Sequence, residues 1–316
     1  MKTKNVIKLA AILIAVIGIS TAGCKKDKNE GSDKEIPSSL KKLANDEATI
    51  QSASDDVLND VNDILAKKTN KGIDSLNWPC NVILDSTITA GSNVTYYLTF
   101  NGSNCNGTRN RDGKVEITIP INTHWSDVGA TVTVKLINLK ISKIPDNGKY
   151  VILNGTKTFE NVSGGLVKDL GNGTITSVVH KITGAIQATF EDNTTRTWNI
   201  TRQRTFTGTF PGQLIVTTDG FGSADGYSNL VVWGVNRDGE NFYTQITQSV
   251  VHRQTCGWDP VSGIKIFQIP GDSKKATVTF GYDDFNNLVT GTNCPTRYKV
   301  DWEKNGNSGT MFIQLP

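Results

Sequence analysis

The chain has 316 residues, of which 37% are hydrophobic, enough for one large or two ordinary buried cores. Its formal net charge at pH 7 is only +3, and its lysines and arginines are scattered rather than gathered on one element. A charge this small and dispersed excludes an electrostatically driven association with polyanions, so we expect no nucleic-acid partner.

Residues 1–23 have the pattern of a bacterial export signal. Lys2, Lys4 and Lys8 give a positive start, and an uncharged, mainly apolar run follows from Leu9 to Ile19. This run is shorter than the roughly 20 residues that a stable membrane span needs, and no later run approaches one. The pattern therefore predicts a signal peptide that is removed.

Thr21-Ala22-Gly23-Cys24 resembles the lipobox of bacterial lipoproteins, although leucine is commonest where this chain has Thr21. The resemblance implies that Cys24 is lipidated on sulfur and becomes the new N-terminus. Because two or more acyl chains anchor a protein stably, we expect a membrane partner through Cys24. The expected location is the outer membrane, facing either the periplasm or the surface. The alternative is an ordinary secretory peptide that leaves Cys24 as a free thiol.

Residues 24–39 are expected to form the lipidated cysteine and its tether. The segment 25–35 is polar, mixed in charge and free of β-branched and aromatic residues, as is typical of a solvated, disordered linker.

Residues 40–72 are expected to contain one amphipathic helix, which Lys67 and Lys68 would end through the helix dipole and which Gly72 would stop. Apolar residues recur there at helical spacing, and acidic residues occupy other faces. We expect the acidic face to be solvated, with a cation site as the alternative. The apolar positions are Leu43, Ile50, Val57, Val61, Ile64 and Leu65, and the acidic ones are Asp55, Asp56, Asp60 and Asp63.

Residues 73–316 are predicted to form an all-β domain, because runs rich in Val, Ile, Thr, Tyr and Phe alternate with turn clusters. No segment is long enough for a parallel crossover, so we expect an antiparallel sheet, either a sandwich or a long meander. The runs are 93–100, 114–121, 131–144, 174–190, 194–206, 230–235, 241–251 and 276–280, and the expected hairpin turns are 110–113, 145–148, 191–193 and 236–239.

Four of the five cysteines remain once Cys24 is lipidated, which outside the cytoplasm indicates two disulfides. Four cysteines allow three connectivities. A faint internal repeat favours one of them, because a cysteine, a strand with Thr-Phe, a turn, a second cysteine and Thr-Arg occur twice. The repeat predicts Cys80 with Cys105 and Cys256 with Cys294, unless Thr-Phe before glycine is merely how strands end here.

Together these features resemble uncharacterised outer-membrane lipoproteins of the Bacteroidota, such as those of flavobacteria. The resemblance implies an envelope β protein and no known activity. It rests on the acidic helix, the Cys-strand-turn-Cys unit, Gly113-Lys114, the strand 155–158, the Arg- and Thr-rich strand 195–205 and the unit 256–263.

Catalytic signatures are weak. The chain lacks the common metalloprotease, nucleophile-elbow and phosphate-loop motifs. Of its three histidines, His180 and His252 follow Val-Val in predicted strands, where a structural histidine is the commoner case, and His124 has only Asp127 at metal spacing. Asp283 and Asp284 are adjacent in a turn and should point apart. We therefore expect no cofactor, no metal and no catalysis.

The strand around Trp198 is the strongest candidate binding site. Alternation places Arg196, Trp198, Arg202 and Arg204 on one face and threonines on the other. The indole could stack on a sugar ring while the guanidinium groups bind carboxylate or sulfate. We favour the alternative, an exposed structural face of the sheet in which arginines stack on aromatic neighbours.

Three hypotheses about function follow. The leading one is a lipid-anchored envelope protein with a non-catalytic structural or interaction role, whose partner would be an envelope protein. The second is a surface glycan-binding lipoprotein, and the third is a hydrolase whose site is assembled from distant strands.

Overall fold

The computed structural model describes residues 35–66, 68–69, 72–73, 78–145 and 148–315. The predicted signal peptide, residues 24–34 of the predicted tether, Lys67 and residues 146–147 of the predicted turn lie outside these residues.

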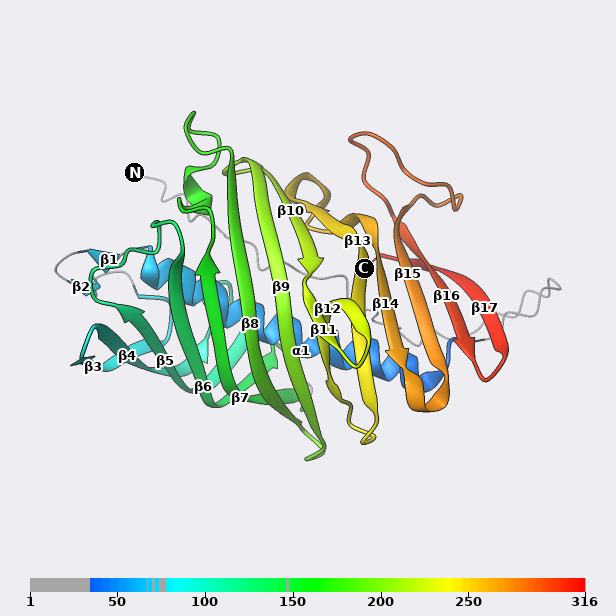
Figure 1. The fold of residues 1–316 in the computed structure, drawn as a ribbon, viewed down its shortest axis with the longest axis horizontal. Helices are drawn as coiled ribbons and strands as arrows, with labels where there is room; N and C mark the ends of the chain where they lie inside the picture. The colour runs from blue at the N-terminus through cyan, green and yellow to red at the C-terminus, as the bar shows by residue number, and fades with distance from the viewer. Residues whose placement is uncertain (1–34, 67, 70–71, 74–77, 146–147, 316) are drawn as a thin grey trace.

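One long helix, α1 (Ser38–Leu65), runs across the strands on one face of a large sheet (Figure 1). It ends earlier than predicted. Lys68 lies in the two-residue strand β1 (Lys68–Thr69), which pairs with β2 (Gly72–Ile73), so the predicted extension of the helix to Lys68 is wrong. The reason is that Lys68 and Thr69 pair with Ile73 and Gly72 as strands, whereas Ala66 still donates its backbone N–H to Asn62 in the last helical turn.

The rest of the described chain forms a single antiparallel sheet of 15 strands, which confirms the all-β prediction and selects a meander rather than a sandwich. Each strand mostly pairs with its neighbours in sequence, from β3 at one edge to β17 at the other (Figure 1). The strands are β3 (Val82–Ala90), β4 (Asn93–Ser103), β5 (Arg109–Pro120), β6 (Ala130–Lys143), β7 (Tyr150–Asn161), β8 (Ser177–Phe190), β9 (Thr195–Thr209), β10 (Gln213–Gly220), β11 (Gly222–Ala224), β12 (Tyr227–Val235), β13 (Asn241–Arg253), β14 (Pro260–Ile269), β15 (Lys274–Tyr282), β16 (Arg297–Lys304) and β17 (Asn307–Gln314).

The centre of the sheet departs from a simple meander. Both β10 and β12 pair with β9 on one side and with β13 on the other, at different positions along these longer strands. The short strand β11 pairs only with β12. This arrangement brings the basic strand β9 close to β13 and places both opposite the helix.

The two copies of the Asn-Arg-Asp-Gly sequence adopt different structures. Residues 236–239 connect β12 to β13, as predicted, whereas residues 110–113 lie within β5, so the turn predicted there is wrong. The pairing register with β6 shifts between Asp112 and Lys114, which marks a β-bulge. Gly113 has φ +138°, and a Cβ atom there would lie 2.6 Å from the carbonyl oxygen of Asn138. Only glycine fits this close approach of two backbones.

The predicted disulfide pairing is confirmed. Cys80 is bonded to Cys105 with a Cα–Cα distance of 4.9 Å, and Cys256 is bonded to Cys294 with a Cα–Cα distance of 5.4 Å. The first bridge joins the segments that flank the β3–β4 hairpin, and the second joins the turn after β13 to the loop before β16. Each bridge therefore closes a unit at its own end of the sheet.

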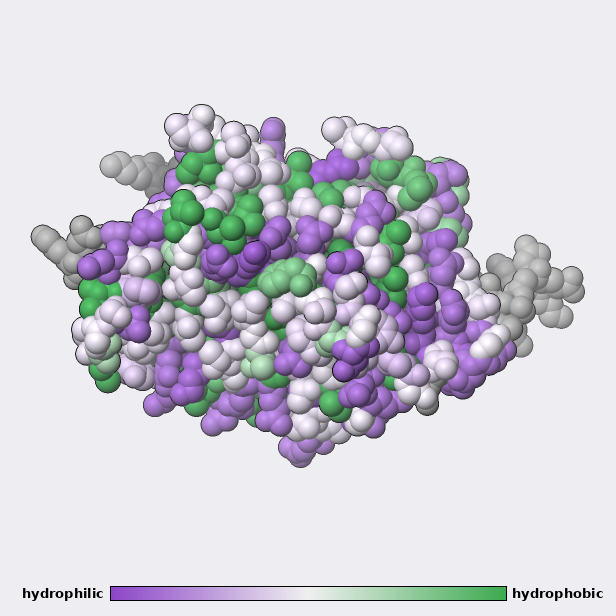
Figure 2. Space-filling model, in the orientation of Figure 1, coloured by the Kyte–Doolittle hydropathy of each residue, from purple (hydrophilic) through white to green (hydrophobic). Residues whose placement is uncertain are grey.

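The core lies between α1 and the sheet. Apolar residues of the helix and of strands from β3 to β16 form one continuous buried cluster. On the face shown in Figure 2, hydrophobic and hydrophilic residues are mixed. No helix in the described part of the chain is both long enough and apolar enough to cross a membrane.

Candidate functional site

Strand β9 carries the predicted binding residues, but its basic face is not exposed. Arg196, Trp198, Arg202 and Arg204 lie on one face, as alternation requires, with exposed fractions of 1%, 0%, 0% and 6%. The expectation of a solvent-facing surface is therefore wrong. The physical reason is that α1 covers this face and supplies carboxylates that compensate its charge.

The main compensating carboxylate is Asp55 in the middle of the helix. Its Oδ2 atom accepts a hydrogen bond from Arg204 Nη2 at 2.6 Å and lies 3.7 Å from Arg202 Nη1. Burial alone would raise the pKa of Asp55, but Arg204 and Arg202 hold it below its ordinary value. The prediction that this side chain is solvated is wrong, because Asp55 forms part of a buried ion-pair group.

Glu47 plays the same role about two helical turns before Asp55. It accepts hydrogen bonds from Lys265 Nζ at 2.5 Å and from the Thr244 hydroxyl at 2.6 Å, and it lies 3.7 Å from Arg196. Although its burial opposes ionisation, Lys265 and Arg196 hold the pKa of Glu47 below its ordinary value. These contacts fix the helix to β9, β13 and β14 at once.

Near the end of the helix, Arg111 of β5 compensates two more carboxylates. It contacts Asp60 and lies 3.6 Å from Asp56, which also accepts a hydrogen bond from Asn104 at 2.7 Å. Asp56 is buried, so the prediction of solvation is wrong there too, whereas Asp63 is exposed as predicted. Burial raises the pKa of Asp60 to about 6 despite the contact with Arg111.

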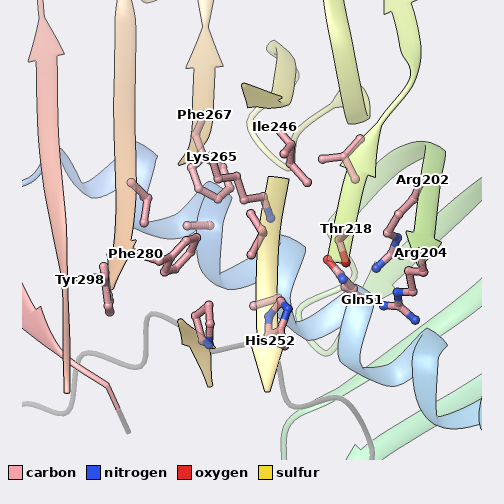
Figure 3. A pocket seen from close by; sticks show the side chains of 16 residues that line it. Gln51, Arg202, Arg204, Thr218, Ile246, His252, Lys265, Phe267, Phe280 and Tyr298 are labelled. Carbon is pink, nitrogen blue, oxygen red and sulfur yellow. The ribbon is translucent and has the colours of Figure 1, made fainter. Parts of the chain in front are cut away.

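A cavity of about 60 Å³ lies between α1 and the strands from β9 to β16 (Figure 3). This volume is several times the roughly 10–15 Å³ that one water molecule needs. The cavity is lined by Ala44, Ala48, Gln51, Arg202, Arg204, Thr218, Val231, Ile246, Val250, His252, Pro260, Lys265, Phe267, Val278, Phe280 and Tyr298.

Arg202 is the unusual member of this lining. None of its three side-chain nitrogens has a hydrogen-bond partner among the described residues, although the side chain is completely buried. Burial lowers its pKa to about 9, as does the neighbouring Arg204, so it remains a cation at neutral pH. A buried cation with unused donors is unfavourable unless something else accepts from it.

Lys157 and His252 complete the polar surroundings of this group. Burial lowers the pKa of Lys157 to about 7, and its Nζ atom donates to the Ser54 hydroxyl and lies 4.9 Å from the centre of the Trp198 ring. Burial, with a contribution from Arg204, lowers the pKa of His252 to about 3, so this ring is neutral. Its Nδ1 atom also lacks a hydrogen-bond partner in the described chain.

Another cavity, of about 120 Å³, lies on the other side of Arg204, against the second half of the helix. It is richer in aromatic rings, and helix α1 supplies half of its polar side chains. Its lining includes Asn59, Asn62, Trp125, Phe159, Phe206 and Trp258.

The other candidate residues do not assemble into a site. His124 approaches Asp127 at 3.8 Å on the surface, and His180 is buried between the rings of Trp125 and Phe206. Across the residues that the structure describes, no three His, Cys, Asp or Glu side chains are placed to hold a metal ion.

Sequence reasoning identified Arg202 and Arg204 but missed their surroundings. Glu47, Gln51, Lys157, His252 and Lys265 come from four other elements, at separations that no local pattern reveals. One signal could have pointed to them, because an acidic helix and a basic strand face in one chain are complementary. No family model, curated protein or solved structure matches the chain.

Proposed function

We propose that the chain is a lipid-anchored cell-envelope protein with a non-catalytic interaction role, and that it binds a small ligand between α1 and the sheet. The observation that carries this proposal is the completely buried Arg202 side chain, which lines a cavity and donates no hydrogen bond to the described residues. Leaving a buried donor unpaired costs about 1–3 kcal/mol, and more for a charged group. A bound ligand that accepts from Arg202 offsets this cost.

Support for a non-catalytic role comes from how the buried charges are used. Glu47, Asp55 and Asp60 each contact an arginine or lysine of the sheet, and these contacts hold the helix in place. Acid–base catalysis needs groups that exchange protons near neutral pH. The carboxylates of Glu47 and Asp55 have lowered pKa values and stay ionised, which suits binding and structure. Asp60 and Lys157 have pKa values of about 6 and about 7, but they contact Arg111 and Ser54 and line neither cavity.

The anchoring part of the proposal is supported by the sequence of residues 1–24. The test is the Cys24→Ser variant expressed in a bacterial host that processes lipoproteins. The parent protein should partition into detergent and carry labelled lipid, whereas the variant should do neither. Lipid labelling of the variant would contradict the assignment of the anchor to Cys24.

The binding part is tested on protein purified from envelopes under mild conditions. Native mass spectrometry should show a bound small molecule that is released unchanged when the protein unfolds. Recovery of the protein with no added mass, or of a chemically altered molecule after incubation, would contradict binding without catalysis.

A second candidate function is glycan binding, favoured by the aromatic cavity. Trp125, Phe206 and Trp258 supply ring faces, and Asn59 and Asn62 supply amides that could hydrogen-bond hydroxyl groups. A screen of the domain against glycans tests it, with Trp258→Ala as the variant expected to lose binding. A negative screen leaves only the first candidate.

A further inference from the structure

The cavity beside Arg202 has two chemically different ends. Figure 3 shows Arg202, Arg204, Gln51 and Thr218 together on one side, and Phe280 and Tyr298 on the opposite side. Val278, Val250 and Ile246 add further apolar surface. A molecule that fills this space must therefore combine one polar group with an apolar body.

We infer that this cavity binds a compact organic monocarboxylate, with the carboxylate on Arg202 and an apolar body directed toward Phe280 and Tyr298. The inference rests on the proposed function and gives its ligand a chemical class.

The charge of the group favours an anionic ligand. Arg202 and Arg204 together carry two positive charges, and Asp55 supplies one negative charge at 3.7 Å and 2.6 Å from them. Lys265 also lines the cavity, and its charge is paired with Glu47 at 2.5 Å. At least one positive charge therefore remains uncompensated in a buried place, and the carboxylate of a ligand offsets it.

The geometry of Arg202 favours a carboxylate. A guanidinium group presents parallel donors that match the two oxygens of a carboxylate. Arg204 already uses Nη2 on Asp55, while Nε, Nη1 and Nη2 of Arg202 have no hydrogen-bond partner among the residues described. The ligand is thus expected to form its main contact with Arg202 alone.

The size of the cavity limits the apolar body. A volume of about 60 Å³ is well below that of a site for a large ligand, so a long acyl chain does not fit without displacing the helix. The volume is also less than half of the roughly 150 Å³ that holds a benzene molecule, so the expected body is an aliphatic group of about two or three carbons. Propionate and butyrate are therefore suitable probes, with propanol and butanol as neutral controls of similar shape.

The experiment is isothermal titration of the purified domain with these four probes and with inorganic phosphate. Propionate or butyrate should bind saturably with a stoichiometry of one, and at least tenfold more tightly than the matching alcohol. Phosphate should bind more weakly than either carboxylate. Equal affinity for the acids and the alcohols, tighter binding of phosphate, or no saturable binding of any acid would overturn the inference.

Two variants locate the site. Arg202→Gln should weaken carboxylate binding about tenfold to hundredfold while leaving alcohol binding unchanged, and Arg297→Gln on β16, away from the cavity, should bind like the parent. If Arg202→Gln does not fold, Ala48→Leu provides the test, because its larger side chain fills space on the helix side of the cavity. Ala48→Leu should reduce binding at least tenfold, and parent-like binding by a folded Ala48→Leu would overturn the assignment.

The outcomes separate this inference from the proposed function. If protein from envelopes carries a small molecule without an acidic group, the binding role stands and the carboxylate assignment fails. If that protein carries no small molecule at all, the proposed function itself fails.

Discussion

The two halves of helix α1 meet the sheet in different ways. In the second half, Asp55, Asp56 and Asp60 contact arginines directly, and Asn104 adds a hydrogen bond to Asp56. In the first half, Glu47 is fully used, but the small side chains of Ala44 and Ala48 leave a cavity against β13–β16. Close ion pairs predominate in the second half, which also borders the aromatic cavity of about 120 Å³, whereas the first half borders the cavity that Arg202 lines.

The difference shows how one interface can combine stability with binding. Ion pairs that satisfy one another hold the helix in register, but they leave nothing for a ligand to gain. Arg202 lies where the two regions meet, and all three of its side-chain nitrogens lack a hydrogen-bond partner among the described residues. We therefore expect variants of the ion-paired residues to change stability and variants at this cavity to change binding.

The largest effect is expected for Asp55→Asn. This change leaves Arg204 and Arg202 buried without their carboxylate, and breaking a buried pair typically costs about 3–5 kcal/mol. Urea unfolding followed by circular dichroism measures the loss. The matched control is Asp63→Asn on the exposed face of the same helix, with an expected change below about 0.5 kcal/mol. Equal effects of the two variants would remove the distinction between buried and exposed helix positions.

A slightly smaller effect is expected from loss of the bridge between Cys80 and Cys105. Replacing both with alanine should cost about 3–4 kcal/mol in the chain-entropy model. Cys80 also accepts a hydrogen bond from Arg111 through its backbone carbonyl, so the loss should loosen the end of the helix. Hydrogen exchange should therefore accelerate in residues 56–65.

The control for that variant is replacement of Cys256 and Cys294 with alanine. Their bridge closes a loop of 38 residues, compared with 25 for Cys80 and Cys105. It should cost a similar free energy without accelerating exchange at the end of the helix. If both double variants alter exchange there equally, the first disulfide unit has no particular role in holding α1.

A moderate effect is expected from His252 as the pH falls. Its pKa is ordinarily near 6.5 and is lowered to about 3 by burial and by Arg204. Between pH 7 and 5 the unfolded chain takes up this proton and the folded chain does not, so the free energy of unfolding falls, by about 2 kcal/mol. Subtracting the free energy of unfolding of His252→Gln from that of the parent at each pH isolates this contribution. The raised pKa of Asp60 changes stability in the opposite direction as the pH falls, and the subtraction removes it. An unchanged difference across this pH range would show that the folded protein protonates His252.

The smallest effect is expected for Lys42→Gln. Lys42 lies on the first half of the helix and pairs with Asp238 at 2.5 Å, but both side chains are exposed. Exposed pairs contribute about 0–1 kcal/mol, so urea unfolding should shift by less than 1 kcal/mol. A loss as large as that of Asp55→Asn would mean that surface pairs, and not buried ones, hold the helix.

The fold was largely predictable because its helix and most of its strands follow from local patterns of apolar and turn-forming residues. The helix follows from spacings such as that of Val57, Val61 and Ile64, and most strands follow from β-branched runs between turns. The errors have local causes as well. The β-bulge at Gly113 has residue types that are also typical of a turn. Residues 68–69 pair with residues 72–73 as strands instead of continuing the helix.

The site was predictable only in part, because alternation fixes which residues share a face but not what covers that face. Arg196, Trp198, Arg202 and Arg204 do share one face of β9. Their burial depends on Asp55 and Glu47, whose charges looked like those of any solvated helix. From a local pattern, a charged residue is expected to be exposed. Its burial can be predicted only when the oppositely charged partner across the interface is known.

The placement of α1 has a consequence for how the protein folds. The helix is the first element of the domain to be synthesised, but Arg204 follows Asp55 by 149 residues and Lys265 follows Glu47 by 218. Until most of the sheet exists, the helix has acids without counter-ions and an apolar face without cover. Contacts between such distant residues close late and slow the folding of a chain. During synthesis, residues 38–65 therefore expose carboxylates and apolar side chains before the strands that cover them exist, and a holding chaperone would bind this segment.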